Sequence, residues 1–358
     1  MSKRATINDI AERSGVSTAT VSLVLNGKAG VSQETRSRVL DIAAELAYAG
    51  KSNSVTMPKP EPISVAMLVK ADVIEVPQEN PFYSKIIWGI EDACRKEDIA
   101  LYFSAQPVDK NNHPSEIPPL LKSKDLGGFL LVGAFVDATI TSALGDKCPP
   151  IVLVDGYSDT NNYDAVVSDN FQASYDAVEH LIKKGHRHIA LVGSEDNAYP
   201  SLQQRRNGYL RALKEYGITD TYIADFNVNL EFGDEAIEEL MRKYPEVTAI
   251  FAVNDKAAVK AIHAIQQVGL LVPQDISVIG YDDTYLAVNV SPKLTTMHVD
   301  SVAMGQAAVQ LLKMRIEHPQ AARMTLTIHT TLVERNSVAS PRINPLLTFP
   351  QPKEENQP

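Results

Sequence analysis

Short, nearly uninterrupted apolar runs recur along this chain from residue 63 onward, and segments with helical periodicity separate them. A strand that is apolar on both faces needs cover on both faces, as in a parallel sheet between two helix layers. The alternation therefore predicts an α/β fold of doubly wound parallel sheets, and about 280 residues suffice for two such lobes. The runs that we predict as strands are Ile63–Val69, Gly128–Val132, Ile151–Val154, Ile189–Val192, Ile250–Val253 and Ile276–Ile279. The helices between them include Ala173–Lys184, Arg206–Tyr216 and Lys256–Val268.

Before residue 50, apolar residues at helical spacing predict three short helices. The first ends near Gly15, and Ser17 or Thr18 can cap the second, which ends near Asn26. Ser32 can cap the third. Two of these helices are too short to be stable alone, so all three must share one small core. Residues 1–49 are therefore predicted to form a separate N-terminal domain.

The first two of these helices fit a helix-turn-helix. Ala11 is small where the two helices must cross, and Gly15 permits the tight turn between them. The second helix then presents Thr18, Ala19, Ser22 and Leu23 outward, where a recognition helix meets the major groove.

Charge is unevenly distributed along the chain. The whole chain has a formal net charge of −10. Residues 1–60 contain eight Lys/Arg and five Asp/Glu, a net charge of +3, which leaves −13 for the remainder. A basic head on an acidic body can contact phosphate with one end only.

Residues 50–62 form the predicted hinge or linker, because prolines at 58, 60 and 62 exclude a regular helix there. Residues 339–358 have no apolar pattern and are predicted to be a disordered tail. Neither a secretion signal nor a membrane-spanning apolar run occurs, so we expect a cytoplasmic protein without membrane contact. The two cysteines, Cys94 and Cys148, are expected to be packing residues.

The N-terminal segment resembles the headpiece of the LacI/GalR family of bacterial repressors. The matching residues include Thr6–Ala11, Gly15-Val16-Ser17, Thr20-Val21-Ser22, Leu25-Asn26-Gly27 and Val31-Ser32. The resemblance implies that Thr18, Ala19 and Leu23 contact base edges. It also implies phosphate contacts from Ser17, Thr20, Ser22, Asn26, Thr35 and Tyr48.

Two positions depart from the family pattern. Many relatives carry arginine or histidine where this chain has Leu23, and leucine offers only apolar contact, for instance to a thymine methyl group. We therefore expect a preference for A·T at that position. Met57 falls where relatives carry a leucine that enters the minor groove, and methionine can act as such a wedge. Because Gly50, Lys51 and Ser52 replace the usual start of the hinge helix, a flexible tether and a working hinge remain equal alternatives.

The remainder, to about residue 338, resembles the family's effector-binding core, which is related to periplasmic sugar-binding proteins. Matching segments include Asn80–Tyr83, Gly185–Ala190, Asn254-Asp255, Gly280–Asp283 and Leu332–Ser337. The resemblance implies two lobes with crossings near residues 167, 296 and 328. Lobe 1 would contain residues 63–167 and 297–327, and lobe 2 would contain residues 168–296 and 328–338.

Several polar residues follow predicted strands of the core. Asp155, Asn254 and Asp282 lie just past carboxyl ends of strands, where open α/β sheets bind ligands. With Arg205 they supply acceptors and fork-like donors that suit neighbouring hydroxyl groups. The family resemblance places these four residues at effector-contacting positions, so a sugar or related polyol is the leading expectation.

Aromatic residues beside this group can stack on a ring face, with Phe82 and Tyr83 as the candidates. We expect Trp88 to pack on its helix face and Tyr281 to belong to the core. Asp255 is expected to cap a helix, and Asp283 is expected to lie in a turn. His186 and His188 have no third ligand nearby, so neither a metal nor a cofactor is expected.

These features favour a regulator over an enzyme. Asp282 and Asp283 are adjacent, and neighbouring carboxylates on one loop rarely flank a scissile glycosidic bond. Nucleophile-elbow, phosphate-loop and zinc motifs are lacking. We expect a homodimeric repressor that reads a palindromic operator and is released by its effector. The alternative is a sugar-binding protein, or a sugar enzyme fused to a helix-turn-helix, without regulated DNA release.

Overall fold

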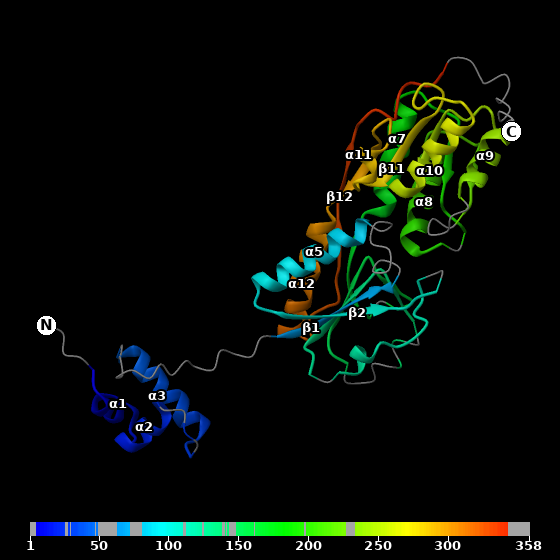
Figure 1. Ribbon diagram of the computed structural model, residues 1–358. Coiled ribbons are helices and arrows are strands. Elements are labelled where there is room, and N and C mark those ends of the chain that lie inside the picture. The colour runs from blue at the N-terminus through cyan, green and yellow to red at the C-terminus, as the bar shows by residue number, and fades with distance from the viewer. Residues whose placement is uncertain are drawn as a thin grey trace, which may run out of the picture. The chain divides into compact units, whose positions relative to one another are not determined.

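The computed structural model divides into two compact units, residues 1–62 and residues 63–358 (Figure 1). The residues that the structure describes are 5–25, 28, 30–46, 48, 63–71, 81–109, 112–123, 125–137, 140, 142, 148–160, 162–196, 198–226 and 233–342. The predicted contacts of Asn26 and Met57 therefore lie outside the described residues.

The described residues of the N-terminal unit form three helices, α1 (Ile7–Ser14), α2 (Thr18–Leu25) and α3 (Gln33–Glu45). A capping box between Thr6 and Asp9 starts α1, and Gly15, with a φ of 68°, ends it. Ile10, Val21 and Val39, one from each helix, are fully buried against one another in a small core. The predicted helix-turn-helix is confirmed.

The larger unit contains two six-stranded sheets, which confirms the predicted doubly wound α/β fold. The first sheet has the order β13-β7-β5-β3-β1-β2 and is parallel throughout. The second has the order β14-β12-β11-β10-β8-β9, in which only β14 is antiparallel to its neighbour among the described strands. A two-stranded sheet, β4-β6, lies beside the first.

The strands of the first sheet are β1 (Ser64–Lys70), β2 (Ala100–Gln106), β3 (Gly128–Val132), β5 (Ile151–Val154), β7 (Asp164–Ser168) and β13 (Thr325–Ile328). Those of the second are β8 (Ile189–Val192), β9 (Tyr222–Ala224), β10 (Ala249–Ala252), β11 (Ser277–Asp282), β12 (Thr295–Val299) and β14 (Thr330–Val333). The small sheet pairs β4 (Phe135–Val136) with β6 (Tyr157–Ser158).

Helices cover the sheets, as Figure 1 shows. They are α5 (Pro81–Lys96), α7 (Asn170–Lys183), α8 (Pro200–Glu215), α9 (Gly233–Lys243), α10 (Asp255–Gln267), the short α11 (Leu286–Asn289) and α12 (Ser301–Glu317), with the 3-10 turn η2 (Pro119–Lys122). In the closely packed α5–α12 pair, a methyl group at Gly89 would collide with the carbonyl oxygen of Val302. Helix α8 begins six residues earlier than expected, because Pro200 suits the first helical turn.

The chain crosses between the two lobes three times. It passes from β7 in the first sheet to α7, from β12 in the second sheet to α12, and from β13 to β14. The second crossing was expected near 296, but β12 remains in the second sheet up to Val299. Its pairing with β14 reaches Val299↔Thr330, so the crossing lies at about residue 300.

The C-terminal segment is attached to lobe 2 as far as residue 342. The Nε2 of His186 donates to the carbonyl oxygen of Ala339 at 2.9 Å, and the Ala339 amide donates to Ser277 Oγ at 3.0 Å. Arg342 donates to the carbonyl oxygens of Asp275, Pro245 and Val247. The prediction of a disordered tail from 339 is therefore wrong for residues 339–342, and residues 343–358 lie outside the described part.

In the described part of the chain, every helix is too short or too polar to cross a membrane.

Candidate nucleic-acid interface and effector cleft

The start of α2 is the exposed end of the helix-turn-helix. Ser17 Oγ accepts a hydrogen bond from the Thr20 amide at 3.1 Å, so Ser17 and not Thr18 caps α2. The hydroxyl groups of Ser17 and Thr20 also lie 2.9 Å apart. Thr18 and Ala19 are exposed, and nothing in the fold requires their side chains for packing.

The other candidate DNA contacts are more enclosed. Ser22 and Leu23 are half-buried on α2. Thr35 accepts a hydrogen bond from Ser32 Oγ at 2.9 Å, and Ser32 caps α3 as expected. Tyr48 packs against the headpiece core. These residues therefore combine a local structural role with partial exposure.

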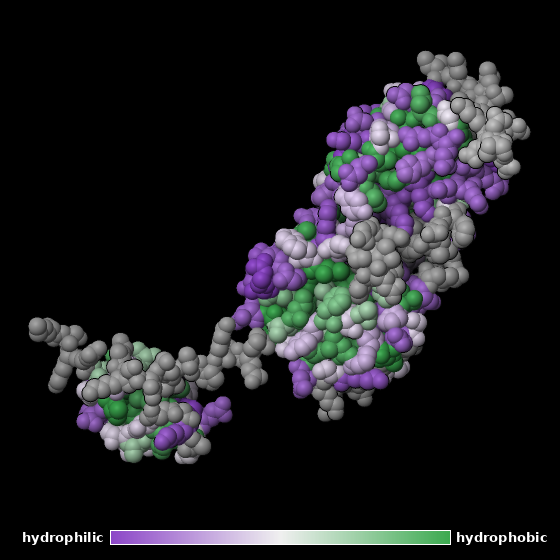
Figure 2. Space-filling model, viewed as in Figure 1, coloured by the Kyte–Doolittle hydropathy of each residue, from purple (hydrophilic) through white to green (hydrophobic). Residues whose placement is uncertain are grey.

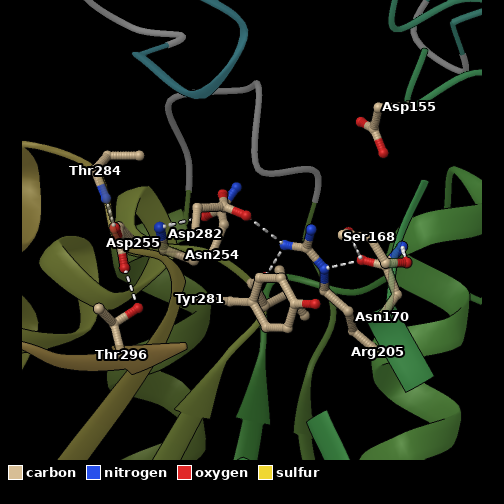
Figure 3. Close-up of polar contacts among 12 residues, drawn as sticks. Asp155, Ser168, Asn170, Arg205, Asn254, Asp255, Tyr281, Asp282, Thr284 and Thr296 are labelled. Atoms are coloured by element: carbon tan, nitrogen blue, oxygen red, sulfur yellow. Dashed lines mark hydrogen bonds and ion pairs between the residues drawn. The ribbon is translucent and has the colours of Figure 1, made fainter. Parts of the chain in front are cut away.

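In the core, Asp155 follows β5, Asn254 follows β10, and Asp282 ends β11. The parallel arrangement brings the ends of β10 and β11 together, and Figure 3 shows Asp282 and Asn254 close to Arg205, with Asp155 facing them from lobe 1. Arg205 lies in the second turn of α8.

Arg205 is buried and held on several sides. Its Nε donates to Asn170 Oδ1 at 2.8 Å and its Nη1 donates to the carbonyl oxygen of Val253 at 2.6 Å. The guanidinium lies 3.7 Å from the centre of the Tyr281 ring. Tyr281 is fully buried, as expected of a core residue, and it also supports the arginine.

The two carboxylates retain hydrogen-bonding capacity. Arg205 Nη1 lies 3.2 Å from Asp282 Oδ1, an ion pair without the alignment of a hydrogen bond. Tyr83 donates its hydroxyl proton to Asp155 Oδ2 at 2.6 Å. Within the described residues, Asp155 Oδ1 and Asp282 Oδ1 are buried without a hydrogen-bond donor. Burial raises the pKa of Asp155, and it raises the pKa of Asp282 to about 7 against the opposing effect of Arg205.

Asn254, and not Asp255, is the residue that caps α10. Asn254 caps α10, because its side-chain oxygen accepts from the Ala257 amide at 2.8 Å. Asp255 is buried and accepts from the Thr284 amide at 2.6 Å and from Thr296 Oγ1 at 2.6 Å. Burial raises its pKa to about 6. The expectation that Asp255 is the cap is wrong, and Asp255 instead ties the loop after β11 to β12.

Asp283 has a left-handed backbone, with a φ of 54°, as its expected turn position requires. Its carboxylate also pairs with Arg335 Nη2 at 2.6 Å and with His298 Nδ1 at 3.0 Å. Both carboxylate oxygens of Asp283 therefore have partners outside the cleft.

The aromatic residues considered as ligand contacts differ in burial. Phe82 and Tyr83 are buried on α5 and meet edge to face, with ring centres 5.2 Å apart. Trp88 is 56% exposed, so the expectation that it packs on its helix face is wrong. Lys70, which sequence reasoning missed, is buried at the end of β1 with Nζ 4.7 Å from the centre of the Tyr83 ring.

His186 and His188 lie at the start of β8 and have local partners. His186 Nδ1 lies 2.9 Å from Thr248 Oγ1, and His188 Nδ1 lies 2.9 Å from the Tyr222 hydroxyl. Across the described ranges, groups of three or more His, Cys, Asp or Glu side chains placed to hold a metal ion are absent.

Family models match both parts of the chain. The model described as "Bacterial regulatory proteins, lacI family" matches residues 6–50, and "Periplasmic binding protein-like domain" matches residues 178–338. Among solved structures, a "transcriptional regulator CelR-cellobiose complex" shares 26% identity at a TM-score of 0.65, covering 93% of this chain and 100% of that one. A LacI family regulator from Enterococcus faecium with bound ribose shares 25% identity at a TM-score of 0.65, covering 78% of this chain and 100% of that one.

Relatives match over almost the whole length. The "HTH-type transcriptional repressor PurR" of Aliivibrio salmonicida is 32% identical over 93% of this chain and 99% of that protein. The "Ribose operon repressor" of Haemophilus influenzae is 33% identical over 94% of this chain and 99% of that protein. With its helix-turn-helix and its two-lobed core, this chain belongs to the LacI family of bacterial DNA-binding transcription regulators.

Proposed function

We propose that this regulator represses transcription at a palindromic operator and that a neutral polyol, in the simplest case a sugar, changes its operator affinity by binding in the cleft. The observation that carries the effector half is the buried cluster of Asp155, Asp282 and Arg205. In the described residues, two oxygens of this cluster accept no hydrogen bond.

The chemistry of these groups favours a hydroxylated ligand. A hydroxyl group can donate to a carboxylate and accept from a guanidinium at once, so neighbouring hydroxyls satisfy both kinds of group. In their ionised form the carboxylates of Asp155 and Asp282 repel a phosphate or carboxylate ligand, and burial also raises the pKa of both groups. The same two oxygens require a ligand that donates hydrogen bonds.

A purine is the second candidate. Relatives of this chain are named PurR, and aromatic rings, which can stack on a flat heterocycle, lie beside Asp155. Tyr157 and Tyr199 meet edge to face with ring centres 5.3 Å apart, close to Asp155. A purine also has N–H donors for the carboxylates.

We propose that the site binds its ligand without cleaving a glycosidic bond. Asp283 pairs with Arg335 and His298, so it does not oppose Asp282 across a substrate bond. A regulator needs only that the ligand binds two arrangements of the protein with different affinity.

For the DNA half, we propose that Thr18, Ala19 and Leu23 contact base edges. Ser17, Thr20, Ser22, Asn26, Thr35 and Tyr48 are the proposed phosphate contacts, with Met57 at the minor groove. Exposure of Thr18 and Ala19 at the start of α2 supports the first set. We also propose the domain limits of the sequence analysis, with the crossing near 300 in place of 296.

We further propose that the protein is a homodimer. Strand β2 is an edge of the first sheet, and its Tyr102 and Phe103 are 51% and 50% exposed. Trp88 on α5 adds to this apolar surface, and Figure 2 shows hydrophobic residues on the visible face near these elements. Exposed aromatic residues beside an unpaired edge strand suit a second copy. Two headpieces could then read two half-sites.

A thermal-shift screen of the purified protein tests the effector proposal. D-ribose, cellobiose, hypoxanthine and guanine are the probes, with ribose 5-phosphate as the anionic comparison. A ligand present at 100 times its dissociation constant adds about 2.7 kcal/mol of stability. Stabilisation by a neutral sugar, lost in Arg205→Ala, supports the proposal. Stabilisation by a purine alone selects the second candidate, and stabilisation only by the phosphorylated sugar contradicts both.

A mobility-shift assay tests the coupling to DNA. The ligand from the screen should lower affinity for the selected operator by about 5- to 150-fold, the usual range of allosteric coupling. Arg205→Ala should bind the operator without responding to that ligand. Unchanged operator affinity of the parent protein at saturating ligand would contradict the regulatory half.

A further inference from the structure

Tyr199 joins the two lobes beside the candidate cleft. It belongs to lobe 2 and precedes α8, the helix that carries Arg205. Its hydroxyl donates to the main-chain oxygen of Asp155 in lobe 1 at 3.0 Å. Its ring meets the ring of Tyr157, also in lobe 1, edge to face. The side chain is buried, so water does not replace this hydrogen bond without an opening of the structure.

Asp155 is therefore held from both lobes. Tyr83 in lobe 1 donates to its carboxylate, whereas Tyr199 in lobe 2 donates to its carbonyl group. Asp155 has a left-handed backbone, with a φ of 46°, which is an uncommon conformation for a residue other than glycine. A backbone in such a conformation persists only where its surroundings hold it.

A second pair of hydrogen bonds connects Arg205 in lobe 2 with Tyr157 in lobe 1. Asn170 Nδ2 donates to the Tyr157 hydroxyl at 3.2 Å, and Asn170 Oδ1 accepts from Arg205 Nε at 2.8 Å. A continuous set of contacts thus runs from Arg205 through Asn170 and Tyr157 to Tyr199 and Asp155. Both ends of the set are candidate effector contacts.

We propose that Tyr199 is an interlobe positioning residue, whose hydroxyl fixes Asp155 in the geometry of the closed cleft. The effector-related consequence rests on the proposed function, but the interlobe contact itself does not. When the lobes separate, Asp155 loses its partner from lobe 2 and its loop is free to change conformation.

Another interlobe hydrogen bond lies at an exposed position. Lys85 Nζ on α5 donates to the Asp283 carbonyl oxygen at 3.4 Å. A long, exposed bond from a flexible side chain contributes less than a buried one, because water competes for both groups. Tyr199 is therefore the residue whose substitution tests the proposal.

Hydrogen–deuterium exchange of the whole protein without added ligand gives the test. Tyr199→Phe keeps the ring and removes only the donor. We expect amides in residues 155–158 of lobe 1 to exchange between about twofold and tenfold faster than in the parent, the range for one lost neutral hydrogen bond.

Tyr216→Phe is the matched control. Tyr216 follows the same helix, and its hydroxyl donates to Glu179 within lobe 2 at 2.6 Å. This variant should leave exchange in 155–158 unchanged. Tyr157→Phe, which removes the acceptor for Asn170, should act in the same direction as Tyr199→Phe.

The location of the change distinguishes positioning from a purely local role. A local role of Tyr199 would alter exchange only in lobe 2, around residues 194–206, and that outcome would overturn the proposal. Unaltered exchange in 155–158 in both Tyr199→Phe and Tyr157→Phe would also overturn it. Because no ligand is added, faster exchange combined with a negative thermal-shift screen would reject the proposed effector and leave the interlobe contact standing.

Discussion

Arg205→Met perturbs the centre of the candidate cleft in a way that pH can reveal. Methionine keeps an apolar stem but removes the cation, which leaves the Val253 oxygen without its donor and Asp282 without its partner. Asn170 Oδ1 keeps only its hydrogen bond from Ser168 Oγ. Breaking a buried ion pair on one side costs about 3–5 kcal/mol. We expect a loss of this size in the free energy of unfolding near pH 7.

The pH dependence follows from the pKa of Asp282. That pKa is about 7 in the folded protein, above the value of about 3.9 for an unfolded chain. The stability contributed by the neutral carboxyl is therefore fully present below pH 4 and is lost as the pH rises to 7. Without Arg205 the folded pKa rises further, so the variant continues to lose about 1.4 kcal/mol per pH unit above 7. Between pH 6 and pH 8.5, the difference between parent and variant should grow by about 1–2 kcal/mol.

Urea denaturation followed by circular dichroism at pH 6 and pH 8.5 measures this difference. Arg206→Met is the matched control, because its partners Asp196 and Asp225 remain in contact with solvent. It should cost less than about 1 kcal/mol at either pH. Arg205→Met combined with Asp282→Asn should reduce the pH trend to the contribution of Asp155, whose pKa Arg205 also lowers. A difference between Arg205→Met and the parent that is the same at both pH values would show that Arg205 does not set the pKa of Asp282.

Three further predictions concern stability. Arg315 forms a fully buried bidentate pair with Asp164 at 2.7 and 3.0 Å, so Arg315→Met should lower the free energy of unfolding in urea by about 3–5 kcal/mol. The control Arg95→Met, at an exposed arginine, should lower it by less than about 1 kcal/mol, and equal losses in the two variants would contradict the prediction. Gly89→Ala should cost about 1–3 kcal/mol, because its methyl group collides with the Val302 carbonyl, and an unchanged melting temperature would exclude the close helix contact. Burial lowers the pKa of His186 to about 4, so the stability that its neutral form contributes is lost as the pH falls from 6.5 to 4. In His186→Gln, the loss of unfolding free energy over this pH range should be smaller by up to about 3 kcal/mol.

The sequence predicts some elements residue for residue. Strands β3, β5 and β8 have the predicted bounds, because each is buried on both faces and therefore apolar throughout. Strand β2 was not predicted, since it lies at a sheet edge and its residues, apart from the buried Gln106, are exposed or half-buried. The expectation that Trp88 packs was wrong, although the spacing of the apolar residues in its helix explains why it is exposed. Ile86 and Ile90 are four residues apart on the buried face, and Trp88 lies between them on the opposite face.

The candidate site could be predicted in part for a similar reason. Asp155 and Asp282 follow apolar strands, so the local pattern places them at the ligand-binding edge of the sheets. The residues that support them could not be found this way. Tyr199 reaches Asp155 across 44 residues and Arg205 reaches Asn170 across 35, and no local periodicity encodes contacts between such distant positions.

We propose that α2 lies in the major groove of operator DNA as a recognition helix. Binding-site selection from random duplexes with the purified protein, followed by titration in increasing salt, tests this placement. We expect enrichment of an inverted repeat, with affinity that falls steeply as salt rises because phosphate contacts release counterions. Equal affinity for selected and unselected duplexes at every salt concentration would show that α2 does not read DNA sequence.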